Sequence, residues 1–60
     1  MSELWLEFDG NVDEKKRYDI ELHGGNIIKD CGVTKQYGEM FFTSEYGNFN
    51  FSLVSRVKEL

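Results

Sequence analysis

The chain contains one histidine and one cysteine, and these two residue types together can form a reactive pair. A deprotonated thiol beside an imidazole is a strong nucleophile, so His23 and Cys31 are the first residues to consider. A hairpin turn at Gly24-Gly25 would place Cys31 opposite Tyr18, several residues along the ladder from His23. No oxyanion donor or third orienting residue is evident. We therefore expect no catalytic residues and a protein that is not an enzyme.

Acidic residues and glycines supply two further candidates, a cation site and a phosphate site. The spacing Asp9-x-Asn11-x-Asp13 matches the start of a calcium loop, but Glu14 and Ile20 stand where that loop needs glycine and glutamate. The glycines lack the lysine and hydroxyl residue that complete a phosphate-binding loop. One cysteine and one histidine cannot close a four-ligand zinc site without carboxylates or a second chain. We therefore expect no metal and no cofactor.

Aromatic residues give the strongest indication of function. Trp5 falls on the glutamate-bearing face of its segment, away from Leu4, Leu6 and Phe8. Phe41 falls on the face opposite Met40 and Phe42. A sheet that packs one face on its core would leave such rings on a contact surface, where Trp and Tyr are common binding hot spots. Alternatively, a closed barrel would use these rings internally. The residues expected to bind a partner are Trp5, Tyr37, Phe41 and Tyr46.

The formal net charge of −4 is distributed unevenly along the chain. Residues 1–14 carry five acidic residues and no basic one, and Lys15-Lys16-Arg17 follow as the only cationic run. An acidic surface repels nucleic-acid backbones and favours a basic partner. The carboxylates expected to steer such a partner are Glu3, Glu7, Asp9, Asp13 and Glu14.

Apolar and polar residues alternate with a period of two in several short segments, which is typical of half-buried strands. In the last segment this pattern puts Phe49, Phe51 and Leu53 on one inward face. Gly24-Gly25 predicts a two-residue hairpin turn, Cys31-Gly32 ends the strand that follows, and residues 33–38 form a connection. The expected strands are 3–8, 17–23, 26–30, 39–44 and 49–57.

The expected fold class is all-β, with residues 1–60 forming one small domain. The chain lacks alanine and proline and is rich in aromatic residues, which favours strands. About five strands with tight turns predict an antiparallel meander, either a twisted sheet or a small barrel of the SH3-like or OB-like kind. An α+β alternative has a short helix over residues 52–60, with Ser52 as N-cap. Four apolar residues fit its helical spacing: Leu53, Val54, Val57 and Leu60.

These features together predict a non-enzymatic interaction protein that binds a protein partner, or itself as a homodimer, through an edge strand and an aromatic patch. In size, acidity and lack of catalytic residues, the chain resembles small accessory proteins encoded by bacteriophages and prophages, although the resemblance covers no motif. There is no apolar run long enough to cross a membrane and no visible secretory signal. A lone thiol without such a signal fits a reducing, cytoplasmic setting.

Two other functions remain as alternatives. A single-stranded nucleic-acid-binding barrel would stack bases on exposed aromatic rings. The stretch Tyr46-Gly47-Asn48-Phe49 is similar to the aromatic motifs of cold-shock domains, but the lysines that surround those motifs are absent here. An acidic inhibitor of a nucleic-acid-processing enzyme would instead imitate a phosphate backbone with its carboxylates.

Overall fold

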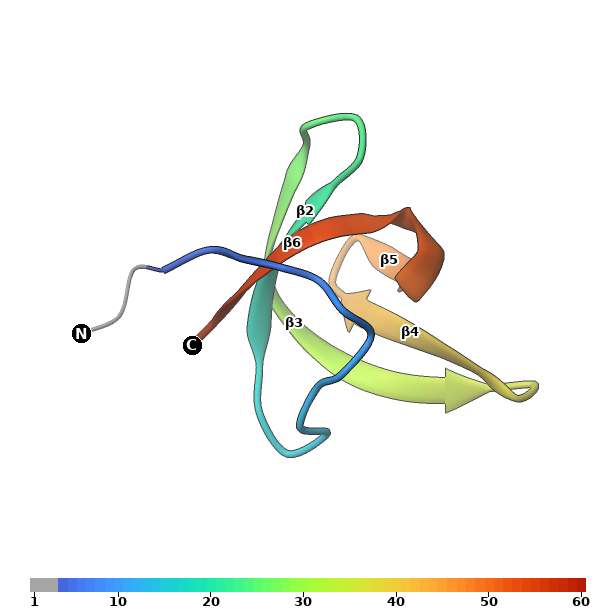
Figure 1. Cartoon of the computed structure of the whole chain (residues 1–60). Coiled ribbons are helices and arrows are strands. Elements are labelled where there is room, and N and C mark those ends of the chain that lie inside the picture. Colours follow the sequence, from blue (N-terminus) through green and yellow to red (C-terminus); the bar gives the residue numbers. More distant parts are fainter. Residues whose placement is uncertain (1–3) are drawn as a thin grey trace.

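The computed structural model describes residues 4–60, which form one antiparallel sheet of six strands in the order β1-β6-β2-β3-β4-β5 (Figure 1). The predicted all-β meander is confirmed, with six strands instead of about five. A single turn of 3₁₀-helix, η1 (Phe51–Leu53), separates the last two strands. The strands are β1 (Leu6–Glu7), β2 (Tyr18–Leu22), β3 (Ile27–Gln36), β4 (Glu39–Ser44), β5 (Gly47–Asn50) and β6 (Val54–Glu59).

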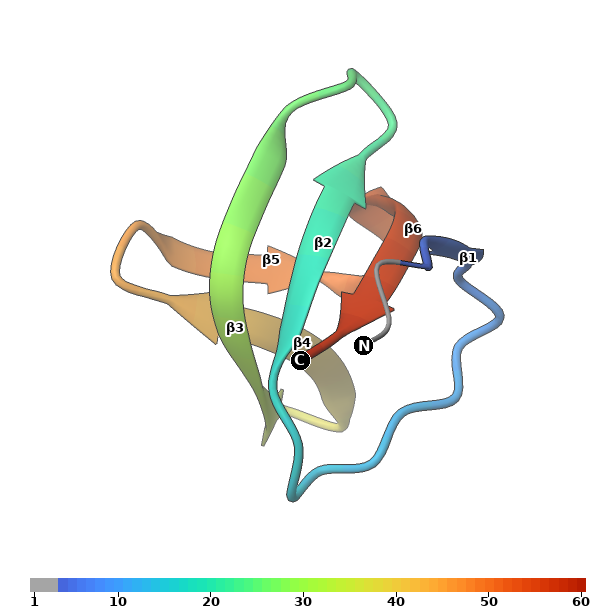
Figure 2. The ribbon, with the colours of Figure 1, turned by 90° about the vertical axis from the view of Figure 1, so that its left-hand side faces the viewer.

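The longest strand, β3, joins the two halves of the sheet. Residues 27–31 pair with β2, whereas residues 32–36 pair with β4. The change of partner falls between Cys31 and Gly32, where β3 curves so that β4 and β5 lie across β2 (Figure 2). The predictions that Cys31-Gly32 ends a strand and that residues 33–38 form a connection were therefore wrong. This glycine marks a corner within one strand, which is a common use of glycine in bent sheets.

The core lies between the two halves of the sheet and is centred on Phe42. This ring is fully buried, and its centroid lies 4.7 Å from that of Phe51, 5.4 Å from that of Phe8 and 6.0 Å from that of Tyr18. Such edge-to-face and tilted contacts stabilise aromatic clusters beyond the area they bury. The buried apolar residues are Tyr18, Ile20, Cys31, Phe42, Val54 and Val57.

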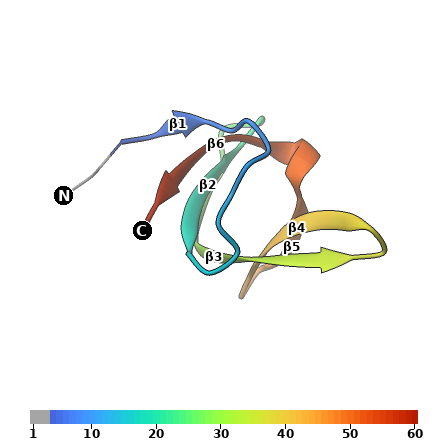
Figure 3. The ribbon, with the colours of Figure 1, turned by 60° about the horizontal axis from the view of Figure 1, so that its bottom comes forward.

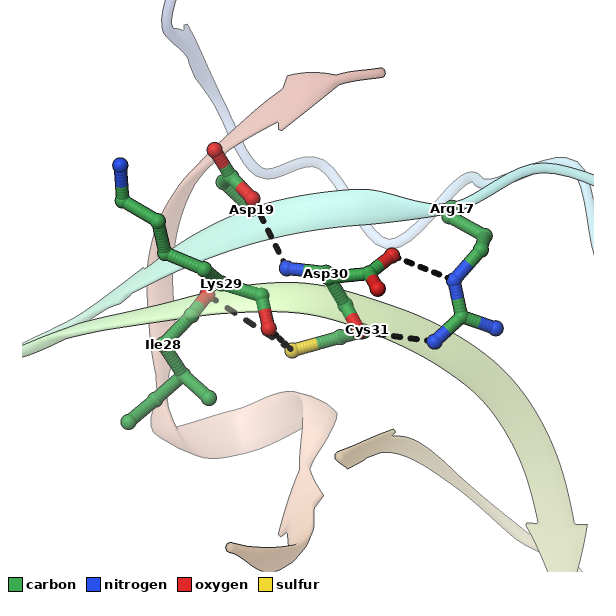
Figure 4. A network of polar contacts seen from close by, with 6 residues as sticks. All are labelled: Arg17, Asp19, Ile28, Lys29, Asp30 and Cys31. Atoms are coloured by element: carbon green, nitrogen blue, oxygen red, sulfur yellow. Dashed lines mark hydrogen bonds and ion pairs between the residues drawn. The ribbon is translucent and has the colours of Figure 1, made fainter. Parts of the chain in front are cut away.

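A β-bulge next to the corner of β3 is held by a buried carboxylate. Lys29 and Asp30 on β3 lie opposite the single residue Asp19 on β2, and Asp30 adopts a φ of 57°. The Asp30 backbone N–H donates to Oδ1 of Asp19 at 2.8 Å (Figure 4). Nζ of Lys58 lies 3.6 Å from Oδ2 of the same carboxylate. Asp19 is 5% exposed, and each of its two carboxylate oxygens has a partner, as a buried charge requires.

Arg17 secures the same bulge from its outer side. Its Nε donates to Oδ1 of Asp30 at 2.5 Å, and its Nη2 donates to the Asp30 carbonyl oxygen at 2.8 Å (Figure 4). A methyl group on Gly32 would lie 3.3 Å from Nη1 of Arg17, so the missing side chain makes room for the guanidinium. The bulge and the corner are thus fixed by polar contacts from β2 and the residue before it.

The C-terminal strand expected over residues 49–57 is interrupted by η1. Asn50 caps this turn, because its Oδ1 accepts the Ser52 backbone N–H at 2.8 Å. The two phenylalanine rings nearest the break pack against the core as predicted, but Leu53 is 48% exposed and Val54 is buried. The turn resets the in-and-out alternation. The helical alternative is also wrong, because the residues after η1 form β6.

The turn between β2 and β3 has three residues instead of two. The Leu22 N–H donates to the Asn26 carbonyl oxygen at 2.9 Å, which leaves His23, Gly24 and Gly25 in the loop. Gly25 has a φ of 97°, a conformation that only glycine adopts freely. The extra loop residue and the bulge at Asp19 offset each other, so that the predicted pairing of Cys31 with Tyr18 is confirmed.

Candidate functional site

The most unusual surface of the protein is the edge strand β1, where Leu6 and the nearby Leu4 are left exposed. A row of directly opposed residues crosses the sheet from β1 to β3: Leu6, Val57, Ile20 and Ile28. Opposed residues share one face of a sheet, so Leu6 lies on the core face, as the alternation predicted. Ile20 and Val57 are buried, however, whereas Leu6 is 56% exposed and Leu4 is 62% exposed. At this edge, the core face of the sheet therefore extends beyond the parts of the chain that cover it.

The backbone of β1 is bonded on one side only. The Phe8 N–H donates to the Ser55 carbonyl oxygen at 3.0 Å, and Leu6 pairs with Val57. Because backbone groups alternate in direction along a strand, the N–H and C=O of Glu7 point away from β6. Within residues 4–60 no strand pairs with this outer side, and β1 lies at the border of the sheet (Figure 3). It is a short, open edge of the kind that accepts another strand.

Trp5 lies on the outer face of the sheet beside this edge. The Nζ of Lys58 lies 5.6 Å from the centroid of the indole ring, and the Cζ of Arg56 lies 5.9 Å from it. Both cations are also ion-paired, Arg56 with Glu21 and Lys58 with Asp19. The ring is half-buried, so it is attached to the outside of the fold by cation–π contacts and is absent from the core.

The other three predicted binding aromatics lie elsewhere. Tyr37 and Tyr46 occupy the hairpin turns at opposite ends of β4 and are 99% and 72% exposed. Phe41 is half-buried within β4, opposite Thr34 and Asn50. Three strands separate β4 from β1 in the sheet order. The structure does not bring the four predicted rings together into one patch.

Tyr37 stands in an unfavourable backbone conformation for its type. Tyr37 and Gly38 have φ values of 54° and 80°, the positive pair of a type I′ hairpin turn, which favours Asn-Gly. We expect Tyr37→Asn to raise the free energy of unfolding by about 1 kcal/mol, because Asn tolerates this conformation far better. The melting temperature should rise by about 4–8 °C. The matched variant Tyr46→Asn changes an exposed tyrosine that has no positive φ, so its melting temperature should not rise. If both variants melted at the same temperature, the explanation would be contradicted.

The predicted steering carboxylates are partly engaged in local structure. Oδ1 of Asp9 and Oδ1 of Asp13 each accept, at 2.9 Å, the backbone N–H of the residue two positions later. These contacts shape the loop between β1 and β2, in which Glu14 is exposed. Glu7 is exposed opposite Arg56 on β6. Glu3 lies outside the described residues.

The two residues that first suggested chemistry are not arranged for it. His23 is exposed in the turn after β2, whereas Cys31 is fully buried on β3. The Cys31 thiol lies 3.7 Å from the carbonyl oxygen of Ile28 and 3.9 Å from that of Lys29 (Figure 4). Across residues 4–60 no group of three or more His, Cys, Asp or Glu side chains is placed to hold a metal ion.

Burial makes Cys31 a poor nucleophile. Loss of solvent, together with the nearby Asp19 carboxylate, raises the pKa of the Cys31 thiol to about 11. We expect iodoacetamide at pH 8 to leave the folded protein unmodified and to alkylate it in urea. Since the folded chain keeps this proton to higher pH, the free energy of unfolding should fall as pH rises from about 9 to about 11. Alkylation of the folded protein at the rate of the unfolded chain would contradict this prediction.

Leu4 and Leu6 were missed as site residues because the alternation groups them with Phe8 on one apolar face, away from Trp5. Alternation reports which face of a strand a residue occupies, but not whether anything covers that face.

Comparison with protein-family models, with curated proteins and with solved structures finds no match to this chain. No helix within residues 4–60 is long and apolar enough to cross a membrane.

Proposed function

We propose that this chain is a non-enzymatic interaction protein that binds an extended segment of a protein at the outer edge of β1. The observation that supports this most strongly is the exposure of Leu4 and Leu6 at β1, an edge strand that is paired with β6 on one side and open on the other. A strand added beside β1 would accept hydrogen bonds from it and cover Leu4 and Leu6 in the same step. The proposal includes a reducing, cytoplasmic setting, in which a single thiol stays free.

Two other parts of the surface support binding at this edge. Trp5 adjoins it on the outer face and offers a large, half-exposed ring as an anchor. Glu7 on the same strand and the acidic loop that follows it place negative charge along this edge, which basic groups on the surface of a partner would complement. Tyr37, Phe41 and Tyr46 lie away from this edge, and their role in binding stays a prediction.

Affinity capture with matched variants tests the proposal. The immobilised wild-type protein is compared with Leu6→Lys and with Ile27→Lys in an extract of the source cell. Leu6 and Ile27 are similarly exposed, at 56% and 50%, but Ile27 lies on β3, two strands away from β1. We expect the wild type and Ile27→Lys to retain the same protein and Leu6→Lys to lose it. Equal retention by all three proteins would exclude the β1 edge as the binding surface.

Trp5→Ala separates a binding role from a structural one. We expect the variant to lose no more than about 1 kcal/mol of stability, the usual contribution of an exposed cation–π contact. Binding at the edge should fall more, because the anchor beside it is removed. Thermal melting followed by circular dichroism measures the first effect, and capture of the same protein measures the second. A variant that unfolds would show that the indole belongs to the core.

A second candidate function, binding of single-stranded nucleic acid, is favoured by one specific feature. Trp5 lies against Arg56 and Lys58, and an aromatic ring beside cations is the usual platform for a stacked base. Both cations are already paired with carboxylates, which weakens this candidate. A labelled oligonucleotide at low salt should then shift with the wild type and not with Trp5→Ala. Absence of any shift at tens of micromolar would exclude it.

A further inference from the structure

We infer that the strand that pairs with β1 is β1 of a second copy, related by a two-fold axis through Leu6. This inference rests on the proposed function and specifies the partner and the register. A two-fold axis makes the interface self-complementary, since each residue of one copy meets its counterpart in the other. The segment 4–8 has a sequence that satisfies this condition in one register.

The direction of the backbone groups restricts the register. The outward N–H and C=O groups belong to the odd-numbered residues Trp5 and Glu7, so these must form the hydrogen-bonded pairs of an antiparallel ladder. With the axis at Leu6, Trp5 of each copy pairs with Glu7 of the other. The two Leu6 residues then face each other as a close, non-hydrogen-bonded pair, with Cα atoms about 4.5 Å apart.

Charge selects this register over its neighbours. An axis at Glu7 would set two carboxylates directly opposite each other, which destabilises a strand pair. An axis at Trp5 would pair the two Trp5 residues with each other, so that neither Glu7 would lie opposite Trp5 of the other copy. With the axis at Leu6, each Glu7 meets Trp5 of the second copy, whose ring is flanked by that copy's Arg56 and Lys58. Each Glu7 carboxylate then lies beside two cations, which also pair with Glu21 and Asp19 of their own copy, and not opposite a second carboxylate.

The apolar face supports the same arrangement. In this register Leu4 of each copy lies opposite Phe8 of the other, and the leucines at position 6 meet on the axis. The row that runs from Ile28 through Ile20 to Leu6 would continue without a break into the second copy. A chain this small buries little apolar surface by itself, and self-association is one of the usual ways to compensate. The exposed leucines are explained by this contact.

A cysteine placed on the axis tests the register directly. Leu6→Cys should form a disulfide-linked dimer with oxidised glutathione, because the paired Cα atoms lie within the range a disulfide spans. Leu4→Cys is the matched control: it is equally exposed, but its two copies would lie about 13 Å apart and should not cross-link. The native Cys31 is retained in both variants, since it is buried. Cross-linking of Leu4→Cys as fast as Leu6→Cys would overturn the register.

Sedimentation equilibrium tests the dimer itself, using a chain made by chemical synthesis. We expect the wild type and Ile27→Lys to approach twice the mass of one chain between about 10 µM and about 1 mM. N-methylation of the Glu7 amide removes one outward donor per copy without touching the β6 ladder. It should raise the dissociation constant by about tenfold or more. Circular dichroism of the N-methylated chain is the control that checks that it is folded.

The outcomes separate this inference from the proposed function. A single-chain mass at every concentration, or a dimer unaffected by N-methylation, overturns the inference. If the monomeric protein still captures another protein in a way that Leu6→Lys abolishes, binding at the β1 edge stands and only the second copy is excluded. If the protein neither forms this dimer nor captures another protein through Leu6, the β1 edge is excluded as a contact surface.

Discussion

The Phe42→Ala variant is expected to be unfolded at 25 °C. Phe42 is fully buried between the two halves of the sheet and contacts the rings of Phe8, Tyr18 and Phe51. Truncating a buried phenylalanine to alanine costs about 3–5 kcal/mol. A domain of this size has a total free energy of unfolding of only about 3–5 kcal/mol, so the cost of the substitution is as large as the whole stability. Near-ultraviolet circular dichroism and urea titration measure the result.

Phe41→Ala is the matched control for this variant, because it removes the same ring from the other face of β4. Phe41 is half-buried and packs outside the core, so its loss should cost less than half as much and leave the chain folded. If the two variants melted at the same temperature, the assignment of faces in β4 would be wrong, and the position of the core with it.

Asp19→Ala should be the most damaging change to a polar residue, with a loss of about 3–5 kcal/mol. The substitution leaves the backbone N–H of Asp30 without its acceptor and removes the contact of the Asp19 carboxylate with Lys58, which is itself largely buried. A buried group deprived of its partner keeps its full desolvation penalty. Urea titration of the variant, or its failure to fold, gives the measurement.

Two further variants identify which contact of Asp19 matters. Asp19→Asn keeps an acceptor for the Asp30 N–H but removes the charge, so it should lose less stability than Asp19→Ala. The double variant Asp19→Ala with Lys58→Met should recover part of the loss, because no cation is then left beside an apolar site. If Asp19→Ala melted like the wild type, the bulge would not depend on this carboxylate.

Much of the fold could be predicted from local patterns. Alternation correctly located β2 and β4, and the pair Gly24-Gly25 correctly marked the hairpin after β2. The pairing of Tyr18 with Cys31 was also predicted, although two local features offset each other to produce it. These successes concern neighbouring strands, where the turn and the alternation determine the register.

The features that could not be predicted depend on distant contacts. The corner at Gly32 arises because β3 changes partner from β2 to β4, and a glycine at a corner looks the same in sequence as one at a strand end. The turn η1 resets the alternation at Leu53 because the chain must turn back to bring β6 between β1 and β2. Both features require knowledge of which strands meet.

The candidate site shows the same division. The edge strand and Trp5 were predicted as contact elements, and the structure puts both at one border of the sheet. The other three aromatics were grouped with Trp5 by residue type alone, and the strand order separates them. Alternation set Leu4 and Leu6 on the face away from Trp5, and the structure places Leu6 on the core face of the sheet but leaves it exposed. Whether a face is covered is a property of the whole fold.

Amide hydrogen exchange tests the open outer edge of β1 most directly. It is measured for each residue by nuclear magnetic resonance in dilute solution. β1 should be bonded to β6 on one side and open on the other, so the Leu6 amide should exchange slowly and the Glu7 amide at the rate of an unfolded peptide. Protection of both amides in a single chain would contradict an open edge. Exchange of both at the unfolded rate would contradict the pairing of β1 with β6.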